Sequence, residues 1–194
     1  MQEIEVKFLS IDPEVMEEKL LKLGAKKIFD QVYRIKVFDY PGFKLDKENA
    51  WLRLRDEGDK ITLTFKHRIV GKKQKRHEND EGMEEYEIII DSYEKAEKIV
   101  LKLGLIQKFY EEKRRIRYMF GDIEFDIDFY PGLEPYLEIE APTWERIDEA
   151  IKLIGLNEKD KKICSTTQIF KLKGIDMLDY EAFTFRGLVK RKDK

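Results

Sequence analysis

The amino-acid sequence predicts an α+β fold, with a largely antiparallel sheet of about eight strands and helices on its apolar side. Segments in which charged and apolar residues alternate recur along the chain, and this period of two is typical of half-buried strands. Three of these segments run directly into a helical pattern, and tight-turn sequences join others. A sheet with such charged faces can hide its edges by closing into a barrel, although closure itself cannot be read from sequence.

One pattern, a charged strand followed by a short helix that ends at a glycine, occurs three times. The strands and their helices are predicted at 3–8 with 12–24, at 85–90 with 91–104, and at 136–141 with 142–155. In the first unit Asp12 and Pro13 suit the N-cap and first helical position, and Gly24 suits the stop. Three such units indicate equivalent parts of one architecture.

Further strands are predicted between these units, at 28–40, 50–56, 60–70, 106–120 and 123–130. Turn sequences at 57–59 and 121–122 predict that their flanking strands pair as antiparallel hairpins. Residues 71–82 have the composition of a mobile loop, 157–173 are predicted to be helical, and 186–194 to be a frayed basic end.

Composition restricts the class of protein. A chain of 194 residues that is 42% hydrophobic fits one domain spanning 1–194. The 38 Lys and Arg nearly balance the 40 Asp and Glu, so no overall field attracts a nucleic-acid polymer or an acidic membrane. No apolar stretch approaches the ~20 residues that cross a bilayer, and no signal peptide is evident. With one cysteine, Cys164, expected to be a buried structural thiol, the sequence predicts a cytoplasmic protein.

The first strand presents Glu3, Glu5 and Lys7 on one face. Side chains two residues apart are about 6 to 7 Å apart along a strand, close enough to share a metal ion and its phosphate. For this strand alone, an ordinary solvated face is the competing interpretation.

Basic residues alternate on other strands. Arg53 and Arg55 share one strand face, and Lys66 lies with two threonine hydroxyls on the next strand, an arrangement that suits phosphate oxygens. The alternative is a structural lattice in which the two arginines pair with Glu85 and Glu87.

Like charges on a third strand require counter-anions, because Lys113, Arg115 and Arg117 project from one face. Asp126 and Asp128 share a face of the strand that follows. Carboxylates can hold Mg²⁺ or Mn²⁺ while Lys and Arg bind phosphates, so the combination of both signs favours a small-molecule triphosphate as the substrate.

An ordered set of motifs makes this interpretation more specific. The motifs are Glu3-x-Glu5-x-Lys7, Leu52-Arg53-Leu54-Arg55, Thr64-Phe65-Lys66, Lys113-x-Arg115-x-x-Tyr118, Asp128 followed by Gly132-Leu133, and Glu138-x-Glu140. In this order, from residue 3 to residue 140, they resemble the CYTH family, also called triphosphate tunnel metalloenzymes.

The resemblance implies an eight-stranded antiparallel closed barrel with the active site inside it, helices outside it, and Mg²⁺ or Mn²⁺ as cofactor. It implies a metal-binding set of Glu3, Glu5, Glu85, Glu87, Asp128, Glu138 and Glu140. It implies a phosphate-binding set of Lys7, Arg53, Arg55, Lys66, Lys113 and Arg115. Glu3, Glu5 and Lys7 would act in catalysis, and a homodimer is suggested by family analogy alone.

Three functions follow from the resemblance. Hydrolysis of tripolyphosphate, thiamine triphosphate or a nucleoside triphosphate is preferred, because the motifs account for triphosphate and metal without a base-specific pocket. The first alternative is a class IV adenylate cyclase that converts ATP to cyclic AMP and pyrophosphate, and the second is a non-catalytic polyphosphate- or nucleotide-binding module. Met83 departs from the family pattern, since many relatives carry a basic residue there, and Arg76 could supply the missing phosphate contact.

Overall fold

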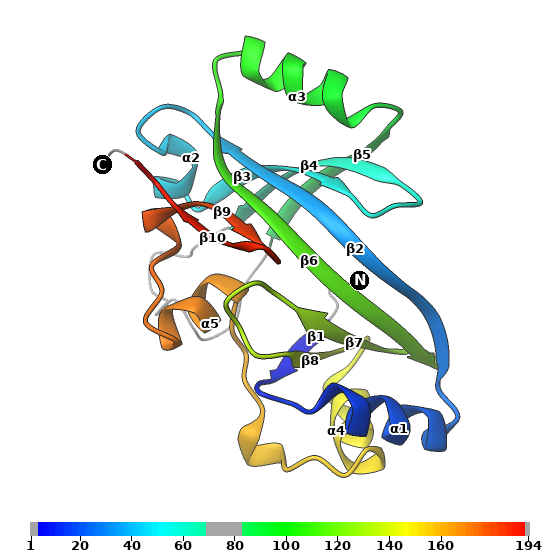
Figure 1. The fold of residues 1–194 in the computed structure, drawn as a ribbon. Coiled ribbons are helices and arrows are strands. Elements are labelled where there is room, and N and C mark those ends of the chain that lie inside the picture. The colour runs from blue at the N-terminus through cyan, green and yellow to red at the C-terminus, as the bar shows by residue number, and fades with distance from the viewer. Residues whose placement is uncertain (1–3, 69–82, 193–194) are drawn as a thin grey trace. The chain divides into compact units, whose positions relative to one another are not determined.

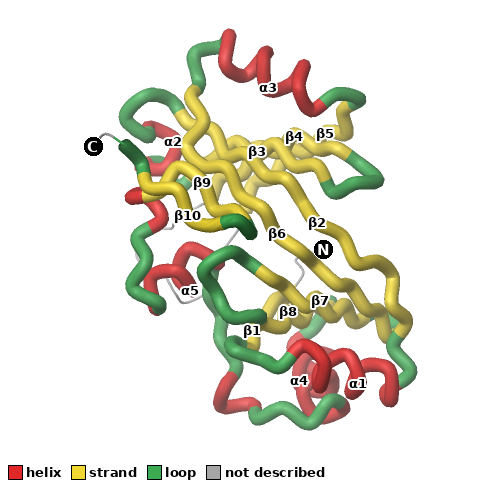
Figure 2. Tube along the Cα trace, viewed as in Figure 1, coloured by secondary structure: helices red, strands yellow, loops and turns green. Residues whose placement is uncertain are grey.

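The computed structural model describes residues 4–68 and 83–192 (Figures 1 and 2). The chain forms two compact units, which we describe separately: unit 1 contains residues 1–31 and 113–177, and unit 2 contains residues 32–112 and 178–194. The predicted α+β class with a large antiparallel sheet is confirmed.

The sheet has ten strands in the described part of the chain. They are β1 (Ile4–Phe8), β2 (Lys26–Asp39), β3 (Ala50–Asp56), β4 (Ile61–Arg68), β5 (Met83–Ile90), β6 (Ile106–Phe120), β7 (Ile123–Phe129), β8 (Tyr136–Ala141), β9 (Tyr180–Thr184) and β10 (Gly187–Lys190). The hydrogen-bonded order is β1-β8-β7-β6-β2-β3-β4-β5, with β9 parallel to β6 and antiparallel to β10. Between the described residues of β1 and β5 no hydrogen-bonded ladder is present, so the sheet is not closed by hydrogen bonds as the predicted barrel requires.

Unit 1 buries the apolar faces of β1, β7 and β8 under two helices, α1 (Pro13–Leu23) and α4 (Trp144–Leu153), which contribute to the same core (Figure 1). The core residues include Val6, Leu20, Phe125, Ile127, Leu137, Ile139, Ile147 and Ile151. As predicted, Asp12 caps α1, accepting hydrogen bonds from two backbone amides at 3.0 and 3.2 Å, and Gly24 ends it at a φ of 88°. With one face of each strand committed to this core, period-two alternation turns the charged residues to the other face.

Unit 2 repeats this arrangement. Its helix α3 (Tyr93–Lys102) packs Ala96 and Val100 against Phe38 and Leu54. The predicted turns at 57–59 and 121–122 do connect antiparallel hairpins, β3 with β4 in this unit and β6 with β7. A short helix, α2 (Lys44–Lys47), precedes β3, and the 3-10 turn η2 (Met177–Asp179) precedes β9.

The C-terminal predictions were wrong in two places. The predicted helix at 157–173 is divided into a 3-10 turn, η1 (Glu158–Asp160), an extended segment and the helix α5 (Thr166–Leu172). In the extended segment, Lys162 exchanges backbone hydrogen bonds of 2.8 and 2.9 Å with Lys7 on the edge of β1. The predicted frayed end instead contributes β10 to a hairpin with β9. The first departure comes from pairing with the distant strand β1, which local helical periodicity does not report. In the second, β10 pairs with the neighbouring β9, which in turn pairs with the distant β6.

The predicted loop at 71–82, with Arg76, lies outside the described residues, as do the last two residues of the strand predicted at 60–70. None of the described helices is long and apolar enough to cross a membrane.

Candidate active site on the charged strand faces

The charged face of unit 1 collects most of the predicted site residues. It consists of Glu5, Lys7, Lys113, Arg115, Arg117, Glu124, Asp126, Asp128, Glu138 and Glu140, which alternate with core residues on β1, β6, β7 and β8. Glu3 lies outside the described residues. We call these ten residues the charged face of unit 1.

Strand register arranges this face in rows. One row runs from Lys7 to Glu138, Asp126 and Arg117, each the cross-strand partner of the next. Cations therefore stand at the two ends of this row with carboxylates between them. Directly opposed side chains lie about 4.5 to 5.5 Å apart at Cβ, so unlike charges in this row attract one another.

Arg115 is the centre of the face. Its Nε and Nη2 donate to the two carboxylate oxygens of Asp128 at 2.7 Å each, and Nη2 also donates to Glu138 at 2.9 Å. Its Nη1 pairs with Asp126. Lys113 adds a contact of 2.7 Å from Nζ to Asp128, a side chain with no solvent exposure. The counter-anions required by the basic strand are thus Asp126, Asp128 and Glu138.

Burial and charge shift the pKa values in this cluster. Burial opposes ionisation of Glu138, but Arg115 and Lys7 outweigh it and hold the pKa of Glu138 well below its usual range. The pKa of Lys113 is lowered, because the side chain is buried and stands beside Arg115. Glu138 is consequently an anion at neutral pH, as a metal ligand has to be.

A second row of cross-strand partners on this face contains only carboxylates, which are the ligands a divalent cation requires. Glu5, Glu140 and Glu124 are successive cross-strand partners, so three carboxylates stand opposite one another. Cations reach this row from its neighbours, because Lys7 pairs with Glu5 and Arg117 lies 2.5 Å from Glu124. Burial, together with the charge of Asp126, raises the pKa of Glu124 to about 7. Opposed carboxylates repel unless one is protonated or a cation lies among them.

The charge balance of the face also fits a cation. Its four cationic and six acidic side chains leave an excess of two negative charges when all are ionised. All available donors are carboxylate oxygens, which suit Mg²⁺ and Mn²⁺. Within residues 4–68 and 83–192 no three acidic, histidine or cysteine side chains already converge as a metal cage. The donor chemistry therefore fits a divalent cation, while arginines and lysines hold several of the carboxylates.

Unit 2 has its own charged face, formed on β3, β4 and β5. Arg53, Thr64 and Glu87 are successive cross-strand partners, and Lys66 is the partner of Glu85. Thr64 donates to Glu87 at 2.8 Å, and the Lys66 ammonium is 2.8 Å from Glu85. Burial and the nearby Arg53 lower the pKa of Lys66. These contacts bring the predicted Arg53, Lys66, Glu85 and Glu87 together.

The predicted lattice of Arg53 and Arg55 with the acidic pair is only partly present. Arg53 lies 3.8 Å from Glu87. Arg55 pairs instead with Glu57, a buried carboxylate in the turn after β3, and stacks over the ring of Tyr33 at 5.8 Å. Sequence reasoning treated Glu57 only as a turn residue, because its ion pair depends on how β3 ends.

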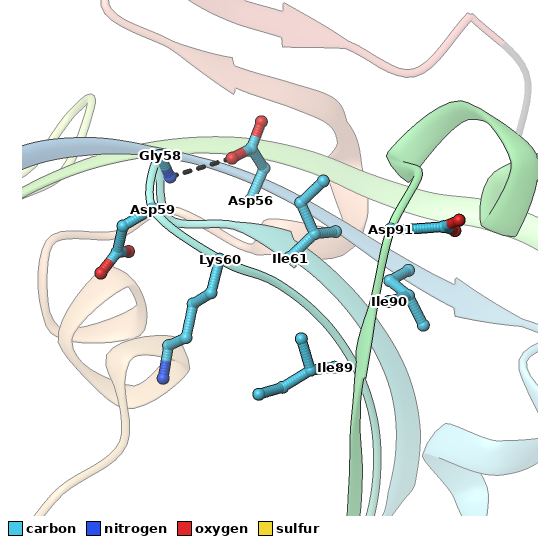
Figure 3. A pocket seen from close by; sticks show the side chains of 8 residues that line it. All are labelled: Asp56, Gly58, Asp59, Lys60, Ile61, Ile89, Ile90 and Asp91. Carbon is cyan, nitrogen blue, oxygen red and sulfur yellow. Dashed lines mark hydrogen bonds between the residues drawn. The ribbon is translucent and has the colours of Figure 1, made fainter.

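A pocket of about 380 Å³ lies elsewhere in unit 2, at the turn between β3 and β4 (Figure 3). Asp56, Asp59 and Asp91 line it together with Lys60 and isoleucines. Arg34 already binds Asp56, with contacts of 2.5 and 3.1 Å, and the carboxylate of Asp91 points away from Asp59 in Figure 3. None of the predicted site residues lines this pocket.

Comparison with known proteins identifies the family. The CYTH domain model matches residues 1–169, most of the chain. The chain belongs to the CYTH family. The predicted resemblance is confirmed.

Among relatives of this CYTH protein is one from Methanocaldococcus jannaschii, named as a candidate adenylate cyclase. It is 30% identical over 175 residues, which cover 90% of this chain and 91% of the relative. Among solved structures, the PH1012 protein of Pyrococcus horikoshii has a TM-score of 0.68 at 23% identity, covering 87% of this chain and 99% of the other. A Hippeastrum protein, described as a candidate adenylyl cyclase with a dominant triphosphatase activity, has a TM-score of 0.63 at 17% identity over 90% and 97% of the two chains. The two structural likenesses concern the fold.

Sequence reasoning left three members of the charged face of this CYTH domain out of the candidate site: Arg117, Glu124 and Asp126. All were visible in the alternation, because residues 124, 126 and 128 project to one side of a strand. The ion pairs that these three residues form could not be predicted from the alternation. Arg117 contacts Glu124 at 2.5 Å and Asp126 at 2.8 Å, and these contacts depend on the register between β6 and β7.

Proposed function

We propose that this CYTH protein is a divalent-cation-dependent triphosphatase that hydrolyses tripolyphosphate, thiamine triphosphate or a nucleoside triphosphate. The observation that carries the proposal is the charged face of unit 1. There Lys7, Lys113 and Arg115 are largely buried among an excess of carboxylates. Cations suit phosphate oxygens, and the excess negative charge would repel a polyanion unless a divalent cation enters with it.

The cations of unit 1 would bind the phosphates by exchanging partners. In the structure the guanidinium of Arg115 donates hydrogen bonds to Asp128 and Glu138 and forms an ion pair with Asp126. Phosphate oxygens can take over the Glu138 contact while the two-bond contact with Asp128 keeps the guanidinium plane oriented. The Lys7 ammonium lies 3.6 Å from Glu138. It would likewise exchange this carboxylate for a phosphate oxygen.

Carboxylates released in this way become available to the metal ion. We assign Glu138 and Glu140 as its first ligands, Glu5 and Glu3 as further ligands, and Asp128 as the residue that orients Arg115. When bound, the ion supplies charge neutralisation and positions the attacking oxygen. Glu85 and Glu87 are assigned as a supporting acidic pair.

Arg53, Arg55 and Lys66 are assigned as further phosphate ligands. The proposal rests here on family motifs and on the clustering of these side chains on one sheet face of unit 2. In hydrolysis, the Lys and Arg side chains stabilise charge that develops on the phosphate oxygens while water attacks the terminal phosphorus.

Cyclisation of ATP is the second candidate, favoured by the name of the M. jannaschii relative. It uses the same phosphate and metal ligands, but the 3′-hydroxyl attacks the α-phosphorus and pyrophosphate leaves. The Hippeastrum protein favours hydrolysis, because triphosphatase activity is described as dominant there.

The test is a product analysis. Purified protein is incubated with Mg²⁺ or Mn²⁺ and, separately, tripolyphosphate, thiamine triphosphate and ATP, and phosphate, pyrophosphate and cyclic AMP are resolved. Phosphate release without cyclic AMP supports the triphosphatase, whereas cyclic AMP with stoichiometric pyrophosphate establishes the cyclase. If calorimetry detects metal-dependent binding of tripolyphosphate but no product forms, both enzymatic functions are overturned. The protein would then be a non-catalytic polyphosphate- or nucleotide-binding module.

A further inference from the structure

An aromatic array lies beside the buried Lys113 in unit 1. The Lys113 ammonium is 5.2 Å from the centroid of the Tyr130 ring and 2.7 Å from Asp128. Tyr130 stacks on Tyr136, with centroids 6.2 Å apart and planes within 8°. Phe170 of α5 meets Tyr130 edge to face at 6.2 Å. These three rings, Tyr130, Tyr136 and Phe170, are the aromatic array.

The array is itself fixed by the fold. Tyr136 is the cross-strand partner of Asp128, and its hydroxyl lies 3.4 Å from the Thr166 hydroxyl at the start of α5. Tyr136 and Phe170 have at most 1% exposure, and Tyr130 has 9%. Rings this buried cannot contact a base or another ligand. Any role they have is therefore exerted on the side chains that surround them.

We propose that Tyr130 is a positioning residue, which holds the Lys113 ammonium toward the charged face of unit 1 and is held in turn by α5 through Phe170. This inference rests on the proposed function for its effect on substrate.

The side chain of Lys113 is long and flexible. Lysine has four rotatable bonds and its ammonium bonds in any direction, so a single carboxylate does not determine where it lies. The face of an aromatic ring attracts the ammonium and shields its other side from water, and this interaction strengthens when the site is desolvated. Asp128 and Tyr130 together restrict where the Lys113 ammonium lies. A preorganised cation then avoids losing rotamer freedom when phosphate binds.

The test compares Tyr130→Leu, which removes the ring, with Tyr130→Phe, which keeps it. We expect Tyr130→Leu to raise the KM for tripolyphosphate about three- to thirtyfold, with a smaller change in kcat, and Tyr130→Phe to restore the wild-type KM. Phe129→Leu is the matched control, because Phe129 also lies beneath a cation, Arg114 at 4.9 Å, outside the charged face. Its KM should not change.

A second readout needs no turnover. The methylene protons of Lys113 next to the ammonium should show a ring-current shift, assigned by its loss in Lys113→Arg. We expect this shift to persist in Tyr130→Phe and to vanish in Tyr130→Leu or, if that variant unfolds, to diminish in Phe170→Leu. An unchanged Lys113 resonance in these variants, or equal KM values for Tyr130→Leu and wild type, would overturn the proposal. If wild type turns over no triphosphate, the proposed function fails while the resonance still tests the positioning.

Discussion

Replacement of Asp128 by Asn tests whether the cluster around Arg115 stabilises unit 1. Asp128 has no solvent exposure, receives two hydrogen bonds of 2.7 Å from Arg115, and contacts Lys113 at 2.7 Å. The amide keeps the shape of the carboxylate but loses its charge, and its NH₂ group faces cations. Two buried cations then lose their shared counter-ion.

Removing one partner of a buried ion pair costs about 3 to 5 kcal/mol. Arg115 keeps Asp126 and Glu138 as partners, so we expect the low end of this range. The free energy of unfolding should fall by about 3 kcal/mol.

Asp30→Asn is the matched control. Asp30 makes the same two-bond contact with Arg114, at 2.8 Å for each bond, but both side chains are about a third or more exposed. Exposed pairs of this kind contribute about 0.2 to 1 kcal/mol. Urea unfolding followed by Trp144 fluorescence in a Trp51→Phe background reports on unit 1, since Trp144 lies in α4. Equal decreases in the free energy of unfolding in the two variants, or no decrease in Asp128→Asn, would refute the argument from burial.

Three further predictions follow from individual residues. Burial raises the pKa of Glu124 from 4.5 to about 7, so the folded state retains a proton that the unfolded state releases. Wild-type stability in metal-free buffer should therefore fall as pH rises from 4.5 to about 7, and Glu124→Gln should abolish this fall, gaining about 1 to 2 kcal/mol above pH 7 after allowance for screening. A pH-independent difference between Glu124→Gln and wild type in urea titrations would contradict this. Asp12→Ala removes the cap of α1 and should cost about 1 kcal/mol, whereas an unchanged urea midpoint would show that the cap contributes nothing. Lys7→Ala should raise the KM for tripolyphosphate about tenfold or more, because a charge-assisted phosphate contact is lost, and normal kinetics would make Lys7 structural.

The sequence predicted those parts of the fold that depend on local chemistry. Asp12 caps α1 as predicted, and the helices predicted to follow residues 91–92 and 142–143 begin there, capped by Ser92 and Thr143. Strand alternation separated charged residues such as Lys7 and Asp126 from the core residues that alternate with them, because a strand in a half-buried sheet has one apolar side. It could not find the Lys162 bridge to Lys7, which depends on a partner far along the chain. It also missed the β9 and β10 hairpin, in which β9 pairs with the distant β6.

In the candidate site, too, local alternation was predictable from the sequence, whereas contacts between distant strands were not. Arg115 and Asp128 were predicted as candidate site residues, but the bonding of one guanidinium to three carboxylates depends on two strand registers. Cys164, predicted to be a buried thiol, is half-buried, and burial raises its pKa. Glu124 escaped notice because its raised pKa arises from burial in the folded sheet and from the charge of Asp126.

Turnover by Glu138→Gln at saturating Mg²⁺ tests the central claim most directly. Glu138 is a buried anion between Lys7 and Arg115, and the substitution removes one ligand charge with little change in shape. Glu149→Gln on α4 is a control outside the charged face, where Arg146 is its partner. We expect phosphate release from tripolyphosphate to fall at least about a hundredfold in Glu138→Gln and to be unchanged in Glu149→Gln. Wild-type rates in folded Glu138→Gln would contradict the assignment of the active site to the charged face of unit 1.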